Sequence, residues 1–281
     1  MKNNYLVIGY PLGHTMSPFI HNLLFSVSKM PAEYFSKEIN PTELESSKKE
    51  LCSYRGFNVT IPHKEKIIPL LDSLHFSAKL YGAVNTVSQN NGKLTGYNTD
   101  ADGFLGALAL KKIEPKGKVL ICGNGGVART IAIALAEKGC SVTLGVRNKE
   151  SEKVPAIKNE IHSLFGADIR VLHLSEIDEP FDIAVNGTPL GMYPNFNGAP
   201  LEKRQLTGTK FVFDTVYNPA ETLFLKYAGE LDIPCMGGMA MLVMQAAKAH
   251  EYWYGHKFKA EEILAVTEKA QKEMERIFYG R

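Results

Sequence analysis

A lysine and an aspartate stand where short apolar runs in the first half of the chain end. Lys64 follows the run "GFNVT" across a break at Pro62, and Asp100 ends "GYNTD". Reduction of a ketone requires a proton for the developing alkoxide, and a lysine can donate it. A neighbouring carboxylate would hold and orient the ammonium group. We therefore take Lys64 and Asp100 as the candidate catalytic pair. The alternative is that Lys64 has no catalytic role and only begins a surface helix.

Further polar residues occur near the ends of the same runs. Their hydroxyl and amide groups would suit a small polyhydroxylated acid better than an apolar substrate. Structural alternatives remain open, because Ser17 and Asp100 are also good helix N-caps and Asn85 is a common turn former. The residues concerned are His14, Thr15 and Ser17 after the first run, Thr60 before the break, and Asn85 in "GAVNT".

A glycine-rich turn opens the second half of the chain. In "KVLICGNGGVART" an apolar run is followed by Gly123, Gly125 and Gly126 and then by a helical pattern. Glycines at this point permit a tight turn and a close approach of the backbone to a pyrophosphate at the amino end of the helix. The strand–turn–helix order predicts a dinucleotide-binding site, although the spacing is GxGG without a third glycine.

The residues after the next apolar run bear on the choice of cofactor. An acidic residue there would hold the ribose 2′-hydroxyl of NAD, whereas arginine suits the 2′-phosphate of NADP. "SVTLGVRNK" ends in Arg147, Asn148 and Lys149, with no acid before Glu150. Two cations and an amide favour NADP, with a solvated basic loop as the alternative.

The pattern along the chain predicts an α/β protein. Strands are expected at 5–9, 32–39 and 56–60, each followed by a helix, at 17–29, 41–53 and 64–72. The β-prone segments 83–89 and 93–99 flank "NNG", a strong hairpin signal. After a helix at 100–112, strands and helices alternate again from 118, which predicts a second, doubly wound parallel sheet. Helices near 239–255 and 260–278 end the chain.

Composition and charge exclude several classes of protein. The chain has 281 residues, 44% of them hydrophobic and 22% charged, with a net charge of +2. No strong positive field favours nucleic acid or a membrane surface. No apolar run approaches the roughly 18 residues of a membrane span, and the N-terminus lacks a signal-peptide pattern. Four scattered cysteines without a CxxC pair indicate a reducing compartment and no metal cluster, so we expect a cytoplasmic protein.

Eight ordered sequence blocks resemble those of the shikimate dehydrogenases. Together they cover about residues 8 to 250, and their order is far more specific than any single block. They are "GYPLGHTMSPFIHN", "GFNVTIPHK", "GAVNTV", "GYNTDADGF", "GNGGVART", "NGTPLGM", "DTVYNP" and "GGMAMLVMQAA".

The resemblance implies roles for the matching positions. Lys64 and Asp100 match the family's catalytic pair. The final helices are expected to return to the first domain, which gives a substrate domain at 1–103 and 237–281 and an NADP-binding Rossmann domain at 104–236. Substrate-binding positions would be Thr15, Ser17, Thr60, Lys64, Asn85, Asp100, Tyr217 and Gln245. Cofactor-binding positions would be Gly123, Asn124, Gly125, Gly126, Val127, Arg147, Asn148, Thr188, Gly238 and Met241.

Two departures from the family pattern affect specificity. Thr15 stands where the family usually has serine, and its extra methyl group could narrow the pocket or admit quinate. Val146 and Asn148 flank Arg147 where the family commonly reads Asn-Arg-Thr, so the arginine alone is kept. NADP is therefore expected, with NAD as an alternative.

The implied function is reversible, NADPH-dependent reduction of 3-dehydroshikimate to shikimate in chorismate and aromatic amino-acid biosynthesis. One alternative is a quinate/shikimate dehydrogenase that uses NAD. Another is a non-catalytic sensor of shikimate and NADP, which the presence of both Lys64 and Asp100 argues against. We expect a monomer or homodimer that binds small molecules, without a metal, a nucleic acid or a membrane.

Overall fold

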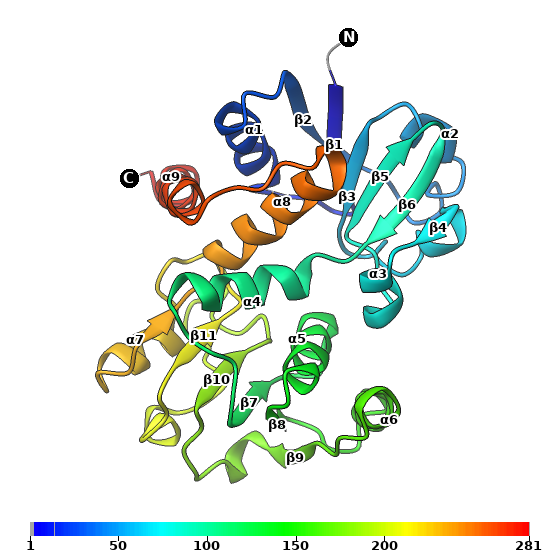
Figure 1. The fold of residues 1–281 in the computed structure, drawn as a ribbon. Coiled ribbons are helices and arrows are strands. Elements are labelled where there is room, and N and C mark those ends of the chain that lie inside the picture. The colour runs from blue at the N-terminus through cyan, green and yellow to red at the C-terminus, as the bar shows by residue number, and fades with distance from the viewer. Residues whose placement is uncertain (1–2, 14, 281) are drawn as a thin grey trace. The chain divides into compact units, whose positions relative to one another are not determined.

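The chain folds into two compact units, each built around a six-stranded sheet. In a computed structural model that describes residues 3–13 and 15–280, the first unit comprises the chain through Gly103 together with Val243–Met274. The second comprises Phe104–Leu242 together with the residues from Glu275 onward. Figure 1 labels the elements of both units. The predicted class, two α/β domains of which the second is doubly wound, is confirmed.

The sheet of the first unit is mixed. Its strand order is β2-β1-β3-β5-β6-β4, in which β1 is parallel to β2 and β3 while β5 is antiparallel to β3 and to β6. The "NNG" hairpin is confirmed, because Asn91 and Gly92 both adopt positive φ between the paired Asn90 and Lys93. The strands are β1 Asn3–Gly9, β2 Ala32–Glu38, β3 Gly56–Val59, β4 Ser73–Leu74, β5 Thr86–Asn90 and β6 Lys93–Tyr97.

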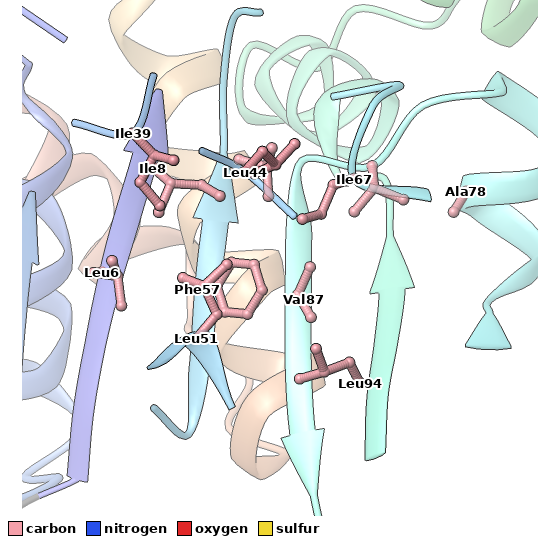
Figure 2. Packing of buried hydrophobic residues seen from close by; sticks show 12 residues of the cluster. Leu6, Ile8, Ile39, Leu44, Leu51, Phe57, Ile67, Ala78, Val87 and Leu94 are labelled. Atoms are coloured by element: carbon pink, nitrogen blue, oxygen red, sulfur yellow. The ribbon is translucent and has the colours of Figure 1, made fainter. Parts of the chain in front are cut away.

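Both faces of this sheet are covered. Leu6 and Ile8 of β1 point to one face, where Figure 2 shows Leu6 level with Phe57 of β3 and Val87 of β5. The alternate residues of β1, Tyr5 and Val7, pack on the other face with aromatic side chains from α1 and α8. The helices that lie wholly in this unit are α1 Ser17–Val27, α2 Lys48–Leu51 and α3 Phe76–Tyr81. Three more are divided between the two units by residue: α4 Asp100–Leu110, α8 Met239–Tyr254 and α9 Ala260–Tyr279.

Three local predictions for this unit are wrong. The helix expected over 41–53 is a series of turns with one short helix, and the helix expected over 64–72 is a turn with a 3₁₀ segment, η1 Ile68–Leu70. Pro69 lacks the backbone N–H that a longer α-helix would use. Ser17 does not cap α1, because it is the first helical residue and Met16 takes the N-cap position without a side-chain bond.

The sheet of the second unit is entirely parallel. Its order, β12-β11-β10-β7-β8-β9, is the doubly wound arrangement in which the chain starts at the centre and builds outward to both edges. Central strands such as β10 are buried at every residue, which explains their uninterrupted apolar sequences. The strands are β7 Lys118–Cys122, β8 Ser141–Val146, β9 Arg170–His173, β10 Ile183–Asn186, β11 Val212–Asp214 and β12 Cys235–Met236.

Helices and 3₁₀ segments connect the parallel strands. Those that bear on the site are α5, which follows β7, and η2, which follows β9. The connecting elements are α5 Gly126–Glu137, α6 Lys153–Phe165, η2 Leu174–Glu176, η3 Lys203–Leu206 and α7 Leu223–Gly229. Among the residues that the structure describes, no helix is long and apolar enough to cross a membrane. No group of three or more His, Cys, Asp or Glu side chains among those same residues could hold a metal ion.

Candidate active site

The mixed topology of the first unit collects polar residues at one edge of its sheet. The parallel strands β1 and β3 both end at this edge, so Thr60 and Lys64 follow β3 there. Because β5 is antiparallel to β3, it begins at the same edge, directly after Asn85. The hairpin then returns β6 to that edge, so Thr99 and Asp100 follow it. Segments up to 40 residues apart in the sequence thus converge through strand direction alone.

The predicted pair of Lys64 and Asp100 lies in direct contact. The Lys64 Nζ donates to Asp100 Oδ2 at 2.6 Å, and the Asn85 amide donates to Asp100 Oδ1 at 2.8 Å. The side chains of Lys64 and Asp100 are 26% and 15% exposed, so the pair is shielded from bulk water yet open to a ligand. An ammonium group held this way is oriented and ready to donate a proton.

The side chain of Asn85 is held in one orientation. Its Oδ1 accepts from the backbone N–H of Thr99 at 2.9 Å and from the hydroxyl of Thr86 at 3.1 Å. Its amide nitrogen must therefore face Asp100, since an amide has one oxygen and one nitrogen end. Gln245 of α8 joins the group, because its Oε1 accepts from the Asn85 amide at 3.3 Å.

Sequence reasoning missed a buried polar network behind this group. The Tyr34 hydroxyl donates to Asn58 Oδ1 at 2.6 Å, and the Asn58 amide donates to Thr86 Oγ1 at 2.9 Å and to the Asn85 carbonyl at 3.0 Å. Tyr34, Asn58 and Thr86 are all buried, so each bond replaces contacts with water that folding removed. Asn58 in "GFNVT" and Thr86 in "GAVNTV" are polar residues within apolar runs, and this pattern is the sequence feature that could have indicated buried hydrogen-bonding groups.

Two buried histidines join α1 to α8 beside this network. His21 Nδ1 lies 2.9 Å from His250 Nε2, and the His21 ring stacks on Tyr34 with ring centroids 4.1 Å apart. His250 Nδ1 lies 2.6 Å from the hydroxyl of Tyr254. Burial lowers the pKa of His21 to about 3 and lowers the pKa of His250 well below its ordinary value. Both rings are therefore neutral at pH 7 and serve as packing and hydrogen-bonding groups.

The remaining predicted substrate residues are divided between the units. Thr15 and Ser17 lie at the amino end of α1, where Thr15 Oγ1 accepts from the Ser17 backbone N–H at 3.2 Å. Thr60 is half-buried and its backbone N–H donates to Ile8 of β1 at 2.9 Å. Tyr217 belongs to the second unit, where burial raises the pKa of its hydroxyl. His14 lies outside the described residues.

The second unit contains a pocket of about 570 Å³ at the carboxyl edge of its sheet. It lies where the strand order reverses between β7 and β10, the place at which doubly wound sheets bind ligands. Gly123 follows β7 with φ +114, and an added Cβ would lie 2.9 Å from Thr188 Cγ2, so the turn requires glycine. Among predicted cofactor residues the lining includes Gly123, Asn124, Gly125, Arg147, Asn148 and Thr188.

The glycine turn carries a third small residue that the sequence analysis overlooked. Ala128 stands three positions after Gly125, where the dinucleotide fingerprint has glycine or alanine. A Cβ on Gly187, after β10, would lie 2.8 Å from the Ala128 Cβ, so both small side chains permit close packing of α5 on the sheet. Gly126 and Val127 form the first turn of α5, whose free N–H groups favour an anion.

The two cations after β8 have different surroundings. Arg147 is exposed, lines the pocket, and forms no ion pair with residues 3–13 or 15–280. Lys149 is paired with Glu176 and does not line the pocket. The prediction that both cations favour a 2′-phosphate therefore applies to Arg147, together with the neighbouring Asn148.

Gly238 and Met241 lie at the start of α8 in the second unit. The Gly238 backbone N–H donates to the Val216 carbonyl at 2.9 Å, and an added Cβ would lie 2.2 Å from the Thr215 carbonyl oxygen. Gly238 is thus required by close backbone packing. Met241 is 8% exposed and neither residue lines the 570 Å³ pocket.

Comparisons with known proteins agree with this architecture. A family model described as "Shikimate dehydrogenase substrate binding domain" matches residues 7–87. The chain is 36% identical over 273 residues to the NADP(+) shikimate dehydrogenase of Caldanaerobacter subterraneus subsp. tengcongensis, covering 95% of this chain and 96% of that protein.

Similar solved structures include complexes with ligands. Shikimate 5-dehydrogenase from Thermus thermophilus, in complex with NADP(H) and shikimate, is 31% identical with a TM-score of 0.86 and covers 95% of this chain and 99% of that one. Shikimate 5-dehydrogenase from Listeria monocytogenes, in complex with shikimate and NAD, is 29% identical with a TM-score of 0.86 and covers 94% of this chain and 96% of that one.

Proposed function

We propose that this chain, which belongs to the shikimate dehydrogenase family, catalyses the reversible reduction of 3-dehydroshikimate to shikimate with NADPH. Its similarity to NADP(+) shikimate dehydrogenases over nearly the full length establishes the family. The observation that carries the activity is the Lys64–Asp100 pair, which is joined through Asn85 to Gln245. The product would feed chorismate and aromatic amino-acid biosynthesis.

The first unit supplies the acid–base group and the polar contacts to the ring. NADPH supplies the hydride when it is bound. Lys64 donates a proton from Nζ to the ketone oxygen as that oxygen becomes a hydroxyl, while Asp100 keeps the ammonium group oriented. The amides of Asn85 and Gln245 and the hydroxyl of Thr60 bind the ring hydroxyls. The hydrogen bond between the side chains of Asn85 and Gln245 supports this assignment for those two residues.

The amino end of α1 binds the substrate carboxylate through Thr15 and Ser17. An eleven-residue helix carries a partial positive charge at its amino end, which favours an anion next to Thr15 and Ser17. The hydroxyl groups add donors in the same place. Thr15 keeps the hydroxyl that the family's serine would offer, so the added methyl group affects shape rather than bonding.

The pocket of the second unit binds the cofactor. The loop Gly123–Val127 and the amino end of α5 take the pyrophosphate, and Arg147 with Asn148 takes the 2′-phosphate of NADP. The pocket lining and the absence of an ion pair to Arg147 within the described part of the chain support these roles. Thr188 lies on the wall of the same pocket. Gly238 and Met241 are assigned to the nicotinamide end of the cofactor by their match to the family pattern alone.

We also propose a role for each domain and a location in the cell. The substrate domain is 1–103 with 237–281, and the NADP domain is 104–236. The match of residues 7–87 to a substrate-binding family model supports the first assignment. A cytoplasmic location agrees with four cysteines that are all free. A monomer or homodimer is proposed for the assembly.

Use of NAD is the second candidate, and one observation favours it. Lys149 is paired with Glu176, so a single cation of the β8 loop faces the pocket among the described residues. The related Listeria enzyme was solved with NAD. Quinate is the corresponding alternative substrate. Thr15 has one methyl group more than the family's serine, and a difference of this size changes the discrimination between two substrates by about 1–3 kcal/mol.

Initial rates with four pairs of reactants test the proposal. Shikimate and quinate are each oxidised by the purified protein with NADP and with NAD. A preference for shikimate with NADP is expected. Comparable rates on quinate or with NAD would move the function to the second candidate, and no turnover in any pair would favour a sensor of these ligands.

A further inference from the structure

An ion pair stands beside the cofactor pocket of the second unit. Lys149 lies in the loop after β8, and Glu176 is the last residue of η2, which follows β9. Because β8 and β9 are adjacent parallel strands, with Val146 opposite His173, both segments leave the sheet at the pocket edge. Leu174 of η2 and Asn148 and Ser151 of the β8 loop line the pocket, and each is close in sequence to a member of the pair.

Glu176 is fixed independently of Lys149. Its Oε2 accepts from the His173 backbone N–H at 3.0 Å, and the His173 side chain accepts from the Ser175 N–H at 3.2 Å, which completes a capping box. The hydrogen bond from Lys149 and the one from the His173 backbone lower the pKa of Glu176, so its carboxylate is charged at neutral pH. Glu176 therefore keeps its position without Lys149, and the lysine side chain is the partner that adapts to form the pair.

The pairing changes the charge that the pocket presents. Arg147 faces the pocket with no ion-pair partner among the described residues, whereas Lys149, two residues later, is absent from the lining. A lysine at the end of this loop could reach a phosphate beside Arg147 if it were released, since its side chain is long and rotatable. Glu176 supplies the competing anion.

We propose that Glu176 is a specificity-determining residue of the cofactor site, which withholds Lys149 from the 2′-phosphate and thereby limits the preference for NADP over NAD. The inference rests on the proposed assignment of this pocket to NADP. It deepens that assignment by naming a residue outside the pocket lining that sets how strongly the 2′-phosphate is selected.

The variant Glu176→Gln separates the two roles of this side chain. Glutamine preserves the capping box, because its amide oxygen can still accept from the His173 N–H, but it removes the charge that holds Lys149. The probes are adenosine 2′,5′-bisphosphate and adenosine 5′-monophosphate, whose binding to the full chain is measured by calorimetry without any turnover. The two differ in the 2′-phosphate alone.

Because the side chains of Lys149 and Glu176 are 42% and 50% exposed, the pair is weak, and Glu176→Gln is expected to tighten binding of the 2′,5′-bisphosphate by about twofold to fivefold. Binding of the monophosphate should stay within about 1.5-fold, and the gain should be smaller at high salt. The ratio of kcat/KM for NADP over NAD should rise by the same factor. Two controls isolate the lysine. Lys149→Gln alone should change neither probe, and Glu176→Gln/Lys149→Gln should lose the gain.

Three results would overturn the inference. They are an unchanged affinity for the 2′,5′-bisphosphate in Glu176→Gln, equal tightening of both probes, or a loss in Lys149→Gln as large as that in Arg147→Gln. Failure of the cofactor assignment has a different signature. In that case the unaltered protein would bind both probes equally, and Arg147→Gln would have no effect on either.

Discussion

The two units build their sites by different means. In the first, the Lys64–Asp100 pair depends on a buried network of side chains that extends through Asn85 and Thr86 to Asn58 and Tyr34. In the second, the pocket depends on backbone: a glycine turn, the amino end of α5 and a reversal of strand order, with Arg147 as the unpaired cation among the described residues.

The difference predicts different weaknesses. A network of side chains loses function when one member changes, because each buried polar group left without a partner costs about 1–3 kcal/mol. A site made from backbone tolerates most side-chain changes and fails where the turn itself is altered. The predictions below follow that contrast from the largest expected effect to the smallest.

Removal of the acid–base group should have the largest effect. Lys64→Ala is expected to lower kcat for shikimate oxidation about 10²–10⁴-fold, because the proton of the reacting hydroxyl loses its acceptor. Shikimate binding, followed by calorimetry, should persist. The neighbouring exposed Lys66 offers a matched control, and Lys66→Ala should keep full activity. Equal losses in both variants would show that the position of Lys64 matters less than the charge of the segment.

Acid should change the local stability around His21 and around Asp214 in opposite directions. His21 of the first unit has a folded pKa of about 3, below its ordinary 6.5. Between these values the unfolded chain binds more protons, so the free energy of unfolding falls as pH falls, by roughly 1–2 kcal/mol per pH unit. His250, whose pKa is also lowered by burial, adds in the same direction.

Asp214 of the second unit acts with the opposite sign. Burial raises its pKa from 3.8 to about 6, although Thr222, Val216 and Asn186 donate hydrogen bonds to its carboxyl group. The folded state therefore binds the proton first, and stability contributed by this group rises as pH falls from 6 towards 4. Hydrogen exchange at pH 6.5 and 5, corrected for intrinsic rates, should show protection falling in α1 and rising in β10. A uniform loss would contradict the contrast.

The glycine turn should be sensitive at one position and tolerant at another. Gly123→Ala is expected to lower the free energy of unfolding by about 1–3 kcal/mol, because φ is +114 and Thr188 lies 2.9 Å from the new Cβ. Gly126→Ala is the control, since it lies in the first turn of α5 with no atom within 4 Å of the added carbon. Urea unfolding should show Gly126→Ala unchanged or slightly stabilised. Equal destabilisation of both variants would refute the assigned role of the turn.

The smallest effect concerns substrate shape at the first site. Thr15→Ser removes one methyl group and is expected to change the ratio of kcat/KM for shikimate over quinate by about tenfold or less. Thr15→Val keeps the branched shape but loses the hydroxyl, so it should raise KM for both acids. If Thr15→Val behaved like the unaltered protein, the hydroxyl would have no part in binding the carboxylate.

Local sequence determined those features that depend on neighbouring residues. The "NNG" hairpin follows from the positive φ that Asn91 and Gly92 accept, and the glycine turn from the tight exit of β7 into α5. The alternation of strands and helices was enough to predict two α/β domains with a doubly wound second sheet. Short elements escaped, because α3 and β4 are too brief to show a period and Pro69 was read as part of a helix.

Tertiary structure alone decided which polar residues meet. Tyr34, Asn58 and Thr86 lie on three strands, and nothing in their spacing indicates one hydrogen-bonded network. Lys149 and Glu176 are 27 positions apart, so the sequence displayed two cations where the fold leaves Arg147 unpaired among the described residues. Turns and other local backbone conformations depend on a few neighbouring residues, so a short stretch of sequence predicts them. The partner of a side chain depends on strand order and direction, which only the folded chain establishes.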